Sequence, residues 1–456
     1  MAVIPRLKFW QMVNMAVGFF GIQFAWSIQM GQMSGLYERL GATPQQVSWF
    51  WIAGPITGIL IQPIIGNMSD HTWGRLGRRR PYFLIGAILS SIVLLAMPNS
   101  PTLWMAASLL WIMDASINIS MQPFRALAAD IAPEEQRGTA YSFQSFAIGL
   151  GSVVSFGLGG ILILDWITKL LGRTGVSFVD SIKPICPTSM HALFYIGAAI
   201  FIVTILWTVF TVREHPPENM EEFRSKKSTK KAFFASFAET WRIVLDMPAN
   251  MRRICLVHSF TWFGFFCIFI FFSPMVAANI FNGQPGTPAY ERGIAWASLC
   301  YLALNTICFI SAPILGLLTK RFRNKSVHAV NLVIGSAAFI SMYYARTPMQ
   351  AMAAMAALGI AWASTQAMPY AILADSIPKE RYGIFMGAFN IFICIPQIVC
   401  SLLAGPVVVL FGGNKAIAMV IGGASMLLAA IFLKRVYEPS VSDLRAGKTI
   451  KEPQAA

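Results

Sequence analysis

The residue most able to do chemistry in this chain is Asp114, a carboxylate inside an otherwise apolar stretch from about 102 to 125. On a helix rising 1.5 Å per residue, about 12 residues on either side place it roughly 17 Å from each end, near the middle of a bilayer. A charge at that depth costs roughly 2.5–3.5 kcal/mol, so such residues usually face a protein interior or a water-filled cavity. Asp114 is therefore the first candidate for function, and a structural hydrogen bond to a neighbouring helix is the alternative.

The polar residues that follow Asp114 occur at helical spacing. At about 100° per residue, three of them share its face: Asn118, Gln122 and Arg125. Arg125 lies about 16 Å along the helix from Asp114, which is too far for a direct ion pair. We therefore expect Arg125 to act at the inner mouth of the helix bundle, near Asp130.

A second polar stripe lies in the first apolar run, from about 10 to 35, where Gln23, Trp26 and Gln29 fall on neighbouring faces of a helix. Amides in hydrocarbon need hydrogen-bond partners, and a sugar in a water-filled cavity is one source of them. Trp26 alone is also typical of packing or of an interfacial anchor. The two glutamines therefore carry the prediction of a substrate site here.

The elements that must position these residues are membrane-spanning helices. The chain has 456 residues, 56% hydrophobic and 12% charged, with mean hydropathy +0.60, which excludes an ordinary soluble protein. We predict an all-α membrane protein with twelve transmembrane helices. The expected spans lie near 10–35, 46–68, 82–98, 102–125, 138–164, 190–212, 253–280, 293–318, 326–345, 349–372, 384–411 and 414–434.

The net charge of +15 follows topology rather than nucleic-acid binding. If both termini are cytoplasmic, the basic residues in outer loops are few: Arg39, Lys169, Arg173, Lys183, Arg292, Arg346 and Lys415. The remaining basic residues then lie inside or at inner span ends, which supports an even number of spans. Because the loops are short and the predicted tails are not long, we expect a bacterial inner membrane. We also expect a monomer.

The predicted soluble segments carry no enzyme motif. They contain no Gly-rich phosphate loop, no metal-ligand spacing of His and Cys, and no nucleophile with a plausible base. Six of the seven cysteines fall in or at predicted spans, so no disulfide framework is indicated. We expect neither an enzyme nor a metal or cofactor site.

An internal repeat divides the chain into two related halves. Residues 123–138, PFRALAADIAPEEQRG, match residues 369–383, PYAILADSIPKERYG, and 62–66 match 312–316. A parallel repeat of six spans is expected of transporter halves around a midplane site. We predict an N-terminal half at 1–212, a cytoplasmic linker at 213–251, a C-terminal half at 252–435 and a cytoplasmic tail at 436–456.

The two halves differ in their ionisable groups. An offset of 246 residues places Ile360 opposite Asp114 and Ala371 opposite Arg125, so we expect coupling chemistry in the N-terminal half. The C-terminal half offers neutral polar residues instead, and helix-to-helix hydrogen bonds are the alternative role for each. Two of these are candidate substrate contacts: Gln366 and Asn390.

The loop at 66–81, GNMSDHTWGRLGRRRP, places Asp70 where it can pair with Arg78 or Arg79 at the inner ends of the spans. This loop resembles the inner-loop motif of the major facilitator superfamily. Its full SD-x-x-x-x-R-x-GRRRP pattern is similar to that of proton-coupled sucrose transporters, near the glycoside-pentoside-hexuronide:cation symporter group. Ordinary positive-inside charge is the alternative for the arginines. We assign gating roles to six residues: Asp70, Arg78, Arg79, Arg125, Asp130 and its repeat counterpart Asp375.

Two further stretches carry the same resemblance. Residues 21–29, GIQFAWSIQ, are similar to the family's first-span pattern, with Ala25 replacing a glycine. The fourth span resembles the family's pattern through Asp114, Asn118, Gln122, Arg125 and Asp130. Gln122 departs from that pattern because it stands next to the proline at 123.

The resemblance implies the major facilitator fold and proton-coupled symport of a glycoside, a disaccharide such as sucrose or maltose, by alternating access. It implies Asp114 as the proton carrier, and the expected substrate contacts are Gln23, Trp26, Gln29, Asn118, Gln122, Gln366 and Asn390. The expected partners are the sugar, protons and the bilayer.

Three alternatives stay open: a sodium-coupled sugar symporter, an exporter of amphiphilic compounds, and a membrane receptor that senses sugar without moving it. A sodium site would want more than one carboxylate. An exporter would favour a Phe and Met cavity without amides. A receptor would usually add a signalling domain, and the short predicted tails leave no room for one.

Overall fold

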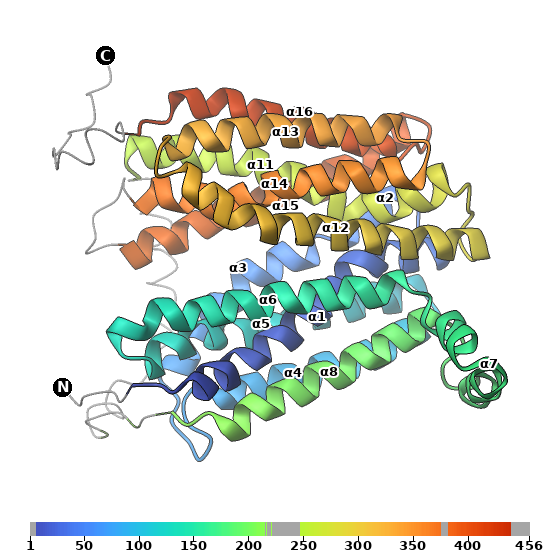
Figure 1. Ribbon diagram of the computed structural model, residues 1–456, viewed down its shortest axis with the longest axis horizontal. Helices are drawn as coiled ribbons and strands as arrows, with labels where there is room; N and C mark the ends of the chain where they lie inside the picture. Colours follow the sequence, from blue (N-terminus) through green and yellow to red (C-terminus); the bar gives the residue numbers. More distant parts are fainter. Residues whose placement is uncertain (1–5, 215, 217–219, 221–246, 375–381, 439–456) are drawn as a thin grey trace.

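The computed structural model describes residues 6–214, 216, 220, 247–374 and 382–438. These residues form a bundle of long helices whose axes run roughly parallel, in two groups (Figure 1). Helices are required here because the hydrocarbon of a bilayer offers no hydrogen-bond partner, so backbone groups must pair within their own segment.

The N-terminal group contains α1 (Phe9–Arg39), α2 (Pro44–Phe50), α3 (Ala53–Asp70), α4 (Arg80–Ala96), α5 (Leu103–Ile131), α6 (Arg137–Gly160) and α8 (Ser189–Thr211). The central helix α1 packs against α5, α6 and α8, while α5 packs against α3 and α4. A threonine hydroxyl caps the start of α5, where Thr102 accepts a hydrogen bond from the backbone of Met105.

The C-terminal group contains α11 (Ala249–Met275), η3 (Val276–Ile280), α12 (Pro288–Leu318), α13 (Asn324–Tyr344), α14 (Pro348–Ala374), α15 (Tyr382–Leu410), α16 (Ala416–Phe432) and η5 (Leu433–Arg435). Helix α11 occupies the centre, against α15 and α16, as α1 does in the first group.

The membrane-spanning architecture agrees with the sequence. Among the described residues, eleven helical segments are long and apolar enough to cross a membrane. Helix α1 is not one of them, although its 31 residues are ample, because its glutamines and serines lower its hydropathy. Together with α1 these segments correspond to the twelve predicted spans, and the predicted all-α membrane fold is confirmed.

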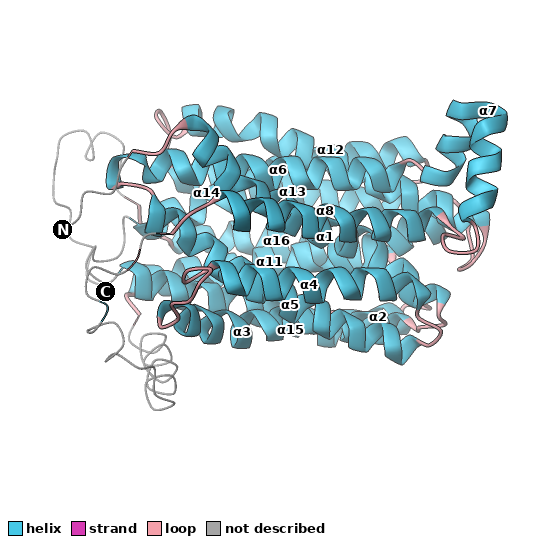
Figure 2. Ribbon diagram, turned by 90° about the horizontal axis from the view of Figure 1, so that it is seen from below, coloured by secondary structure: helices cyan, strands magenta, loops and turns pink. Residues whose placement is uncertain are grey.

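Two details differ from the prediction. Residues near 165–189 were expected to be loop, whereas Ile163–Ile182 forms α7, which Figure 2 shows at one corner of the bundle end, running crosswise to the long helices. The second span is broken at 51–52 into α2 and α3. The predicted linker at 213–251 and tail at 436–456 lie mostly outside the described residues.

The two groups meet at one end of the bundle. We call the end where α1 begins and α16 finishes the near end, and the opposite end the far end; Figure 1 shows the groups diverging toward the near end. At the far end, Ser48 on α2 donates to Ser401 O on α15 at 2.8 Å. A Cβ on Gly405 would lie 2.7 Å from Gln45 Cα, so glycine is what allows α15 to approach α2 this closely.

An ion pair also joins the groups at the far end. Glu38, at the last turn of α1, lies with Oε1 2.9 Å from Lys415 Nζ, and its Oε2 accepts a 2.7 Å hydrogen bond from Tyr290 of α12. A second pair connects Arg39 Nη1 to Glu291 Oε1 at 3.3 Å. Because Glu38 and Lys415 are only 4% and 13% exposed, their interaction is weakly screened by solvent.

We expect Glu38→Gln to weaken closure of the far end, because the amide cannot neutralise Lys415 and removing one partner of a buried pair costs about 3–5 kcal/mol. The measurement is the alkylation rate of a cysteine introduced at Ser298, which is buried between the groups beside Gln32 and should react faster. Asp165→Asn changes an exposed carboxylate of α7 and is the matched control. An unchanged rate in Glu38→Gln would show that this pair does not hold the far end closed.

Candidate functional site

Asp114 lies in the middle of α5 and is 2% exposed. Gln29 Nε2 of α1 donates a 2.9 Å hydrogen bond to its Oδ1. The structure therefore brings together the polar faces of the first and fourth predicted spans. Each face is one polar strip on an otherwise apolar helix, and packing the two strips together keeps both away from lipid.

Helix α3 supplies the third side of this site. Asn118 Nδ2 donates to the carbonyl of Asp114 at 2.9 Å and to Thr57 Oγ1 of α3 at 3.3 Å. Gln62 Nε2, also on α3, donates to Asn118 Oδ1 at 2.7 Å. Thr57 and Gln62 were not among the residues expected at this site. Gln62 is an amide inside an apolar run, so the criterion that selected Gln29 could have found it.

Two buried oxygen atoms of this network have no hydrogen-bond partner among the described residues: Gln29 Oε1 and Asp114 Oδ2. Both accept hydrogen bonds, and a hydroxyl group of a ligand or a water can donate to them. The arrangement can hold a proton on the carboxylate and bind a hydroxyl-rich molecule at the amides.

The other predicted residues of the N-terminal group lie around this network rather than in it. Gln23 is half-buried beside Gly151 of α6, and Trp26 is half-buried against the core. Gln122 is half-buried and lies next to Gly66 of α3. The structure thus separates Gln23 from Gln29, because residues six apart on a helix point about 120° from each other.

The two predicted contacts from the C-terminal group are not part of the cluster at Asp114. Asn390 is half-buried on α15, one turn before Cys394, whose sulfur would lie 3.7 Å from a Cβ on Gly58 of α3. It therefore lies near the boundary between the groups. Gln366 is exposed on α14.

The predicted gating residues form an ion cluster at the near end. Arg79 Nη2 lies 2.6 Å from Asp70 Oδ1, and its Nε lies 2.8 Å from Asp130 Oδ2. Arg78 Nη2 lies 2.9 Å from Asp130 Oδ1. Burial by itself would lower the pKa of Arg79, but the carboxylates of Asp130 and Asp70 outweigh it and raise that pKa. These contacts join α3, α4 and α5 within the N-terminal group.

Glu214, just after α8, completes the near-end cluster. Its carboxylate accepts hydrogen bonds from the backbone N–H groups of Arg78, Arg79 and Arg80 at 2.8–3.0 Å. It also lies 3.7 Å from Arg80 Nε. Glu214, which stands at the start of the predicted linker, was not among the expected gating residues.

Two gating predictions have a different outcome. Arg125 is exposed on α5, and Asp130 pairs with Arg78 and Arg79 rather than with it among the described residues. The group that interacts electrostatically with Arg125 is Tyr370 of α14, from the C-terminal group. Asp375 lies outside the described residues.

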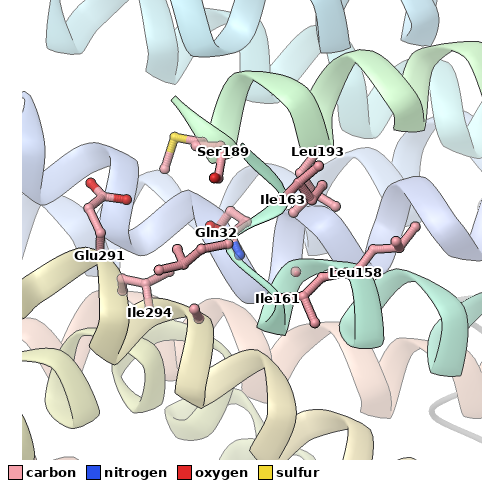
Figure 3. Close-up of a pocket in the computed structure, with 12 residues that line it drawn as sticks. Gln32, Leu158, Ile161, Ile163, Ser189, Leu193, Glu291 and Ile294 are labelled. Atoms are coloured by element: carbon pink, nitrogen blue, oxygen red, sulfur yellow. The ribbon is translucent and has the colours of Figure 1, made fainter. Parts of the chain in front are cut away.

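Figure 3 shows a small pocket at the far end, between α1, α6, α8 and α12. Its lining is mostly apolar, with Gln32, Ser189 and Glu291 as polar residues, and Glu291 is paired with Arg39. None of the residues around Asp114 lines it. We therefore interpret it as a crevice of the far-end closure and not as the candidate site. Among the described residues, no three His, Cys, Asp or Glu side chains converge on a metal position.

Comparison with known proteins identifies the family. The Major Facilitator Superfamily model matches residues 15–401, with a second match at 293–453. The chain is 26% identical over 455 residues to "Sucrose transport protein SUC4" of Arabidopsis thaliana, covering 90% of this chain and 86% of that protein. It is 25% identical over 533 residues to "General alpha-glucoside permease" of Schizosaccharomyces pombe, covering 94% and 93%.

A solved structure shares the fold. It is that of a bacterial homolog of the human lysosomal transporter Spinster, in an inward-facing and unoccupied conformation, and it matches with a TM-score of 0.66 at 16% identity, over 94% of this chain and 95% of that one. The resemblance found in the sequence motifs is confirmed, and the family consists of transporters rather than enzymes. The chain belongs to the Major Facilitator Superfamily, as a multi-pass membrane transporter related to sucrose transporters and an alpha-glucoside permease.

Proposed function

We propose that this protein carries a glycoside, a disaccharide such as sucrose or maltose, across the membrane together with protons. The observation that carries the proposal is the buried network of Asp114, Gln29 and Asn118, in which one carboxylate lies among amides that bond hydroxyl groups well. The names of the relatives support the substrate class. The proposed contacts also include Gln23, Trp26 and Gln122 around this network, and Gln366 and Asn390 of the C-terminal group outside it.

Asp114 is the proposed proton carrier. Holding a charged carboxyl among helices is costly, and taking up a proton removes that cost before the two groups rock past each other. In the described conformation the groups are joined at the far end. A sugar or a proton bound at Asp114 would therefore exchange with the solution at the near end. The near-end cluster would hold α3, α4 and α5 as one body during this motion.

A sodium-coupled symporter is the alternative from the same fold. Hard cations bound by proteins are surrounded by several oxygen ligands, and carboxylates are prominent among them. Among the described residues, Asp114 interacts with no second carboxylate. Proteoliposome uptake with an imposed proton or sodium gradient, over a panel of disaccharides, distinguishes the two.

For topology, we propose that both chain ends are cytoplasmic, so that the near end is the inner one. The cluster of Arg78, Arg79 and Arg80 at the near end supports this, because basic residues are enriched on the cytoplasmic side. A monomer in a bacterial inner membrane is the proposed working unit.

The sharpest test is Asp114→Asn, which keeps the size of the side chain but cannot cycle a proton. We expect this variant to lose sugar accumulation driven by a proton gradient in proteoliposomes, while sugar exchange without a gradient is partly retained. In the wild type, uptake should fall as the external pH rises, because fewer carriers are protonated on that side. Full accumulation by Asp114→Asn, with the wild-type pH dependence, would return Asp114 to a structural role; Asp165→Asn is the control.

The near-end cluster makes a separate prediction. Asp70→Asn removes the negative charge that lies 2.6 Å from Arg79 but leaves Asp130 in place, so we expect slower interconversion between the two access states with nearly unchanged sugar binding. The effect should be smaller than that of Asp130→Asn, because Asp70 is 53% exposed and lies 3.8 Å from Arg78, whereas Asp130 is 27% exposed and lies 2.9 Å from Arg78 and 2.8 Å from Arg79. Exchange rate and equilibrium binding are measured in parallel, and a large loss of affinity with normal turnover would contradict a gating role.

The role of Arg125 is tested with one variant that keeps the positive charge, Arg125→Lys, and one that removes it, Arg125→Ala. We expect Arg125→Lys to retain part of the transport activity and Arg125→Ala to retain little, because the alanine variant loses the cation that interacts electrostatically with Tyr370 of the other group. Arg346→Ala, which removes an exposed arginine at the far end, should leave uptake unchanged. Equal activity in the two Arg125 variants would leave this residue as ordinary positive-inside charge.

A further inference from the structure

The carboxylate of Asp114 lacks a hydrogen-bond donor on one side. Gln29 donates to Oδ1, whereas Oδ2 is buried without a partner among the described residues. Buried polar atoms nearly always bond to protein or to ordered water. A donor is therefore required beside Oδ2 whenever the carboxylate is charged.

Tyr37 offers a donor on that side. Its side chain is fully buried, and its hydroxyl has no partner among the described residues. The centre of its ring lies 5.1 Å from that of Phe50, which stands four residues before Gly54. Tyr37 stands eight residues beyond Gln29 on α1, about 12 Å closer to the far end. Side chains on a helix lean toward its N-terminus, so the tyrosine ring extends back toward the level of Asp114. Tyr37 therefore stands on α1 on the far-end side of Gln29, which holds the other oxygen of the carboxylate.

Gly54 of α3 leaves the space beside Oδ2 unfilled by a side chain. A Cβ at this position would lie 3.5 Å from Oδ2, which is an ordinary contact distance. The residues that face this part of α5 from α1, α3, α4 and α6 carry no charge at neutral pH: Gln29, Tyr37, Thr57, Gln62, Gly86 and Gln144. No charged neighbour among the described residues competes with Tyr37 for the carboxylate.

We propose that the Tyr37 hydroxyl, through one ordered water beside Gly54, completes the hydrogen bonding of Asp114 Oδ2 and forms the far-end proton path to this carboxylate. The water accepts a hydrogen bond from Tyr37 and donates one to Oδ2. A proton that arrives on the water oxygen is balanced by transfer of another hydrogen from that water to Oδ2, which leaves a neutral water and a neutral carboxyl. The proton that reaches the water is the phenolic hydrogen of Tyr37, and the proton that enters from the far end replaces it on the phenolic oxygen, so the tyrosine stays neutral. This inference rests on the proposed role of Asp114 as coupling group.

The first test is Tyr37→Phe, which removes only the hydroxyl. Without this donor the charged form of Asp114 is less favoured, so Asp114 stays protonated up to a higher pH. We expect the pH of half-maximal proton-driven uptake to rise by about one unit, a tenfold lower proton concentration, which corresponds to about 1.4 kcal/mol. Tyr301→Phe is the matched control, because Tyr301 is equally buried but donates to Ile268 O in the C-terminal group. It should leave the pH midpoint unchanged even if it lowers thermal stability.

The second test is Gly54→Ala, which leaves Tyr37 intact and places a methyl group against Oδ2. Alanine is favoured over glycine in a helix, so α3 should be kept. We expect the methyl group to displace the water and to raise the pH midpoint in the same direction as Tyr37→Phe. If the pH midpoint shifts in Tyr37→Phe but not in Gly54→Ala, the placement of the ordered water beside Gly54 is wrong.

The outcomes separate this inference from the proposed function. If Asp114→Asn still accumulates sugar with the proton gradient, the proposed function fails, and the role of Tyr37 fails with it. If Asp114→Asn loses accumulation while Tyr37→Phe and Gly54→Ala both keep the wild-type pH midpoint and rate, only the Tyr37 path is overturned. An equal shift in Tyr301→Phe would also overturn it, because the effect would then be a general consequence of losing a buried hydroxyl.

Discussion

A carboxylate held among apolar helices needs hydrogen-bond donors close by, and the arrangement of the N-terminal group follows from supplying them to Asp114. Helix α1 contributes the Gln29 amide, and α5 turns Asn118 onto the carbonyl of Asp114 itself. Helix α3 fixes Asn118 through Thr57 and Gln62. Because each polar group also needs a partner in hydrocarbon, the three helices are held in one relative orientation.

The two ends of the bundle use charge differently. At the far end, Glu38 pairs with Lys415 and so joins the N-terminal and C-terminal groups. At the near end, Asp70 and Asp130 pair with Arg78 and Arg79 inside one group. Ion pairs between the groups can be exchanged as the groups move, whereas pairs within a group keep its helices together. This distribution suits rigid-body rocking about a central site.

Much of the architecture follows from local sequence. Apolar runs predicted the spans, because a bilayer requires about 20 apolar residues per helix. The motifs at 21–29, 66–81 and 114–130 predicted the family, which comparison with known proteins confirms. Helix α7 was not predicted. Its residues alternate between apolar and polar faces and do not form a continuous apolar run, so this segment was expected to be a loop. Gln366 and Asn390 were chosen by polarity alone, and polarity cannot distinguish a residue near the boundary between the groups from one exposed elsewhere on a helix.

The sequence by itself determined that this chain is a helical membrane transporter with one deep carboxylate, because hydropathy, charge and helical spacing are properties of each segment alone. Only the tertiary structure decided which groups meet. It paired Asp114 with Gln29 and not with Gln23, placed Gly54 on the open side of the carboxylate, and set Glu38 against Lys415, 377 positions away. These partners come from different helices, and the distances between them depend on how the helices pack. The spacing of residues along one helix does not determine that packing.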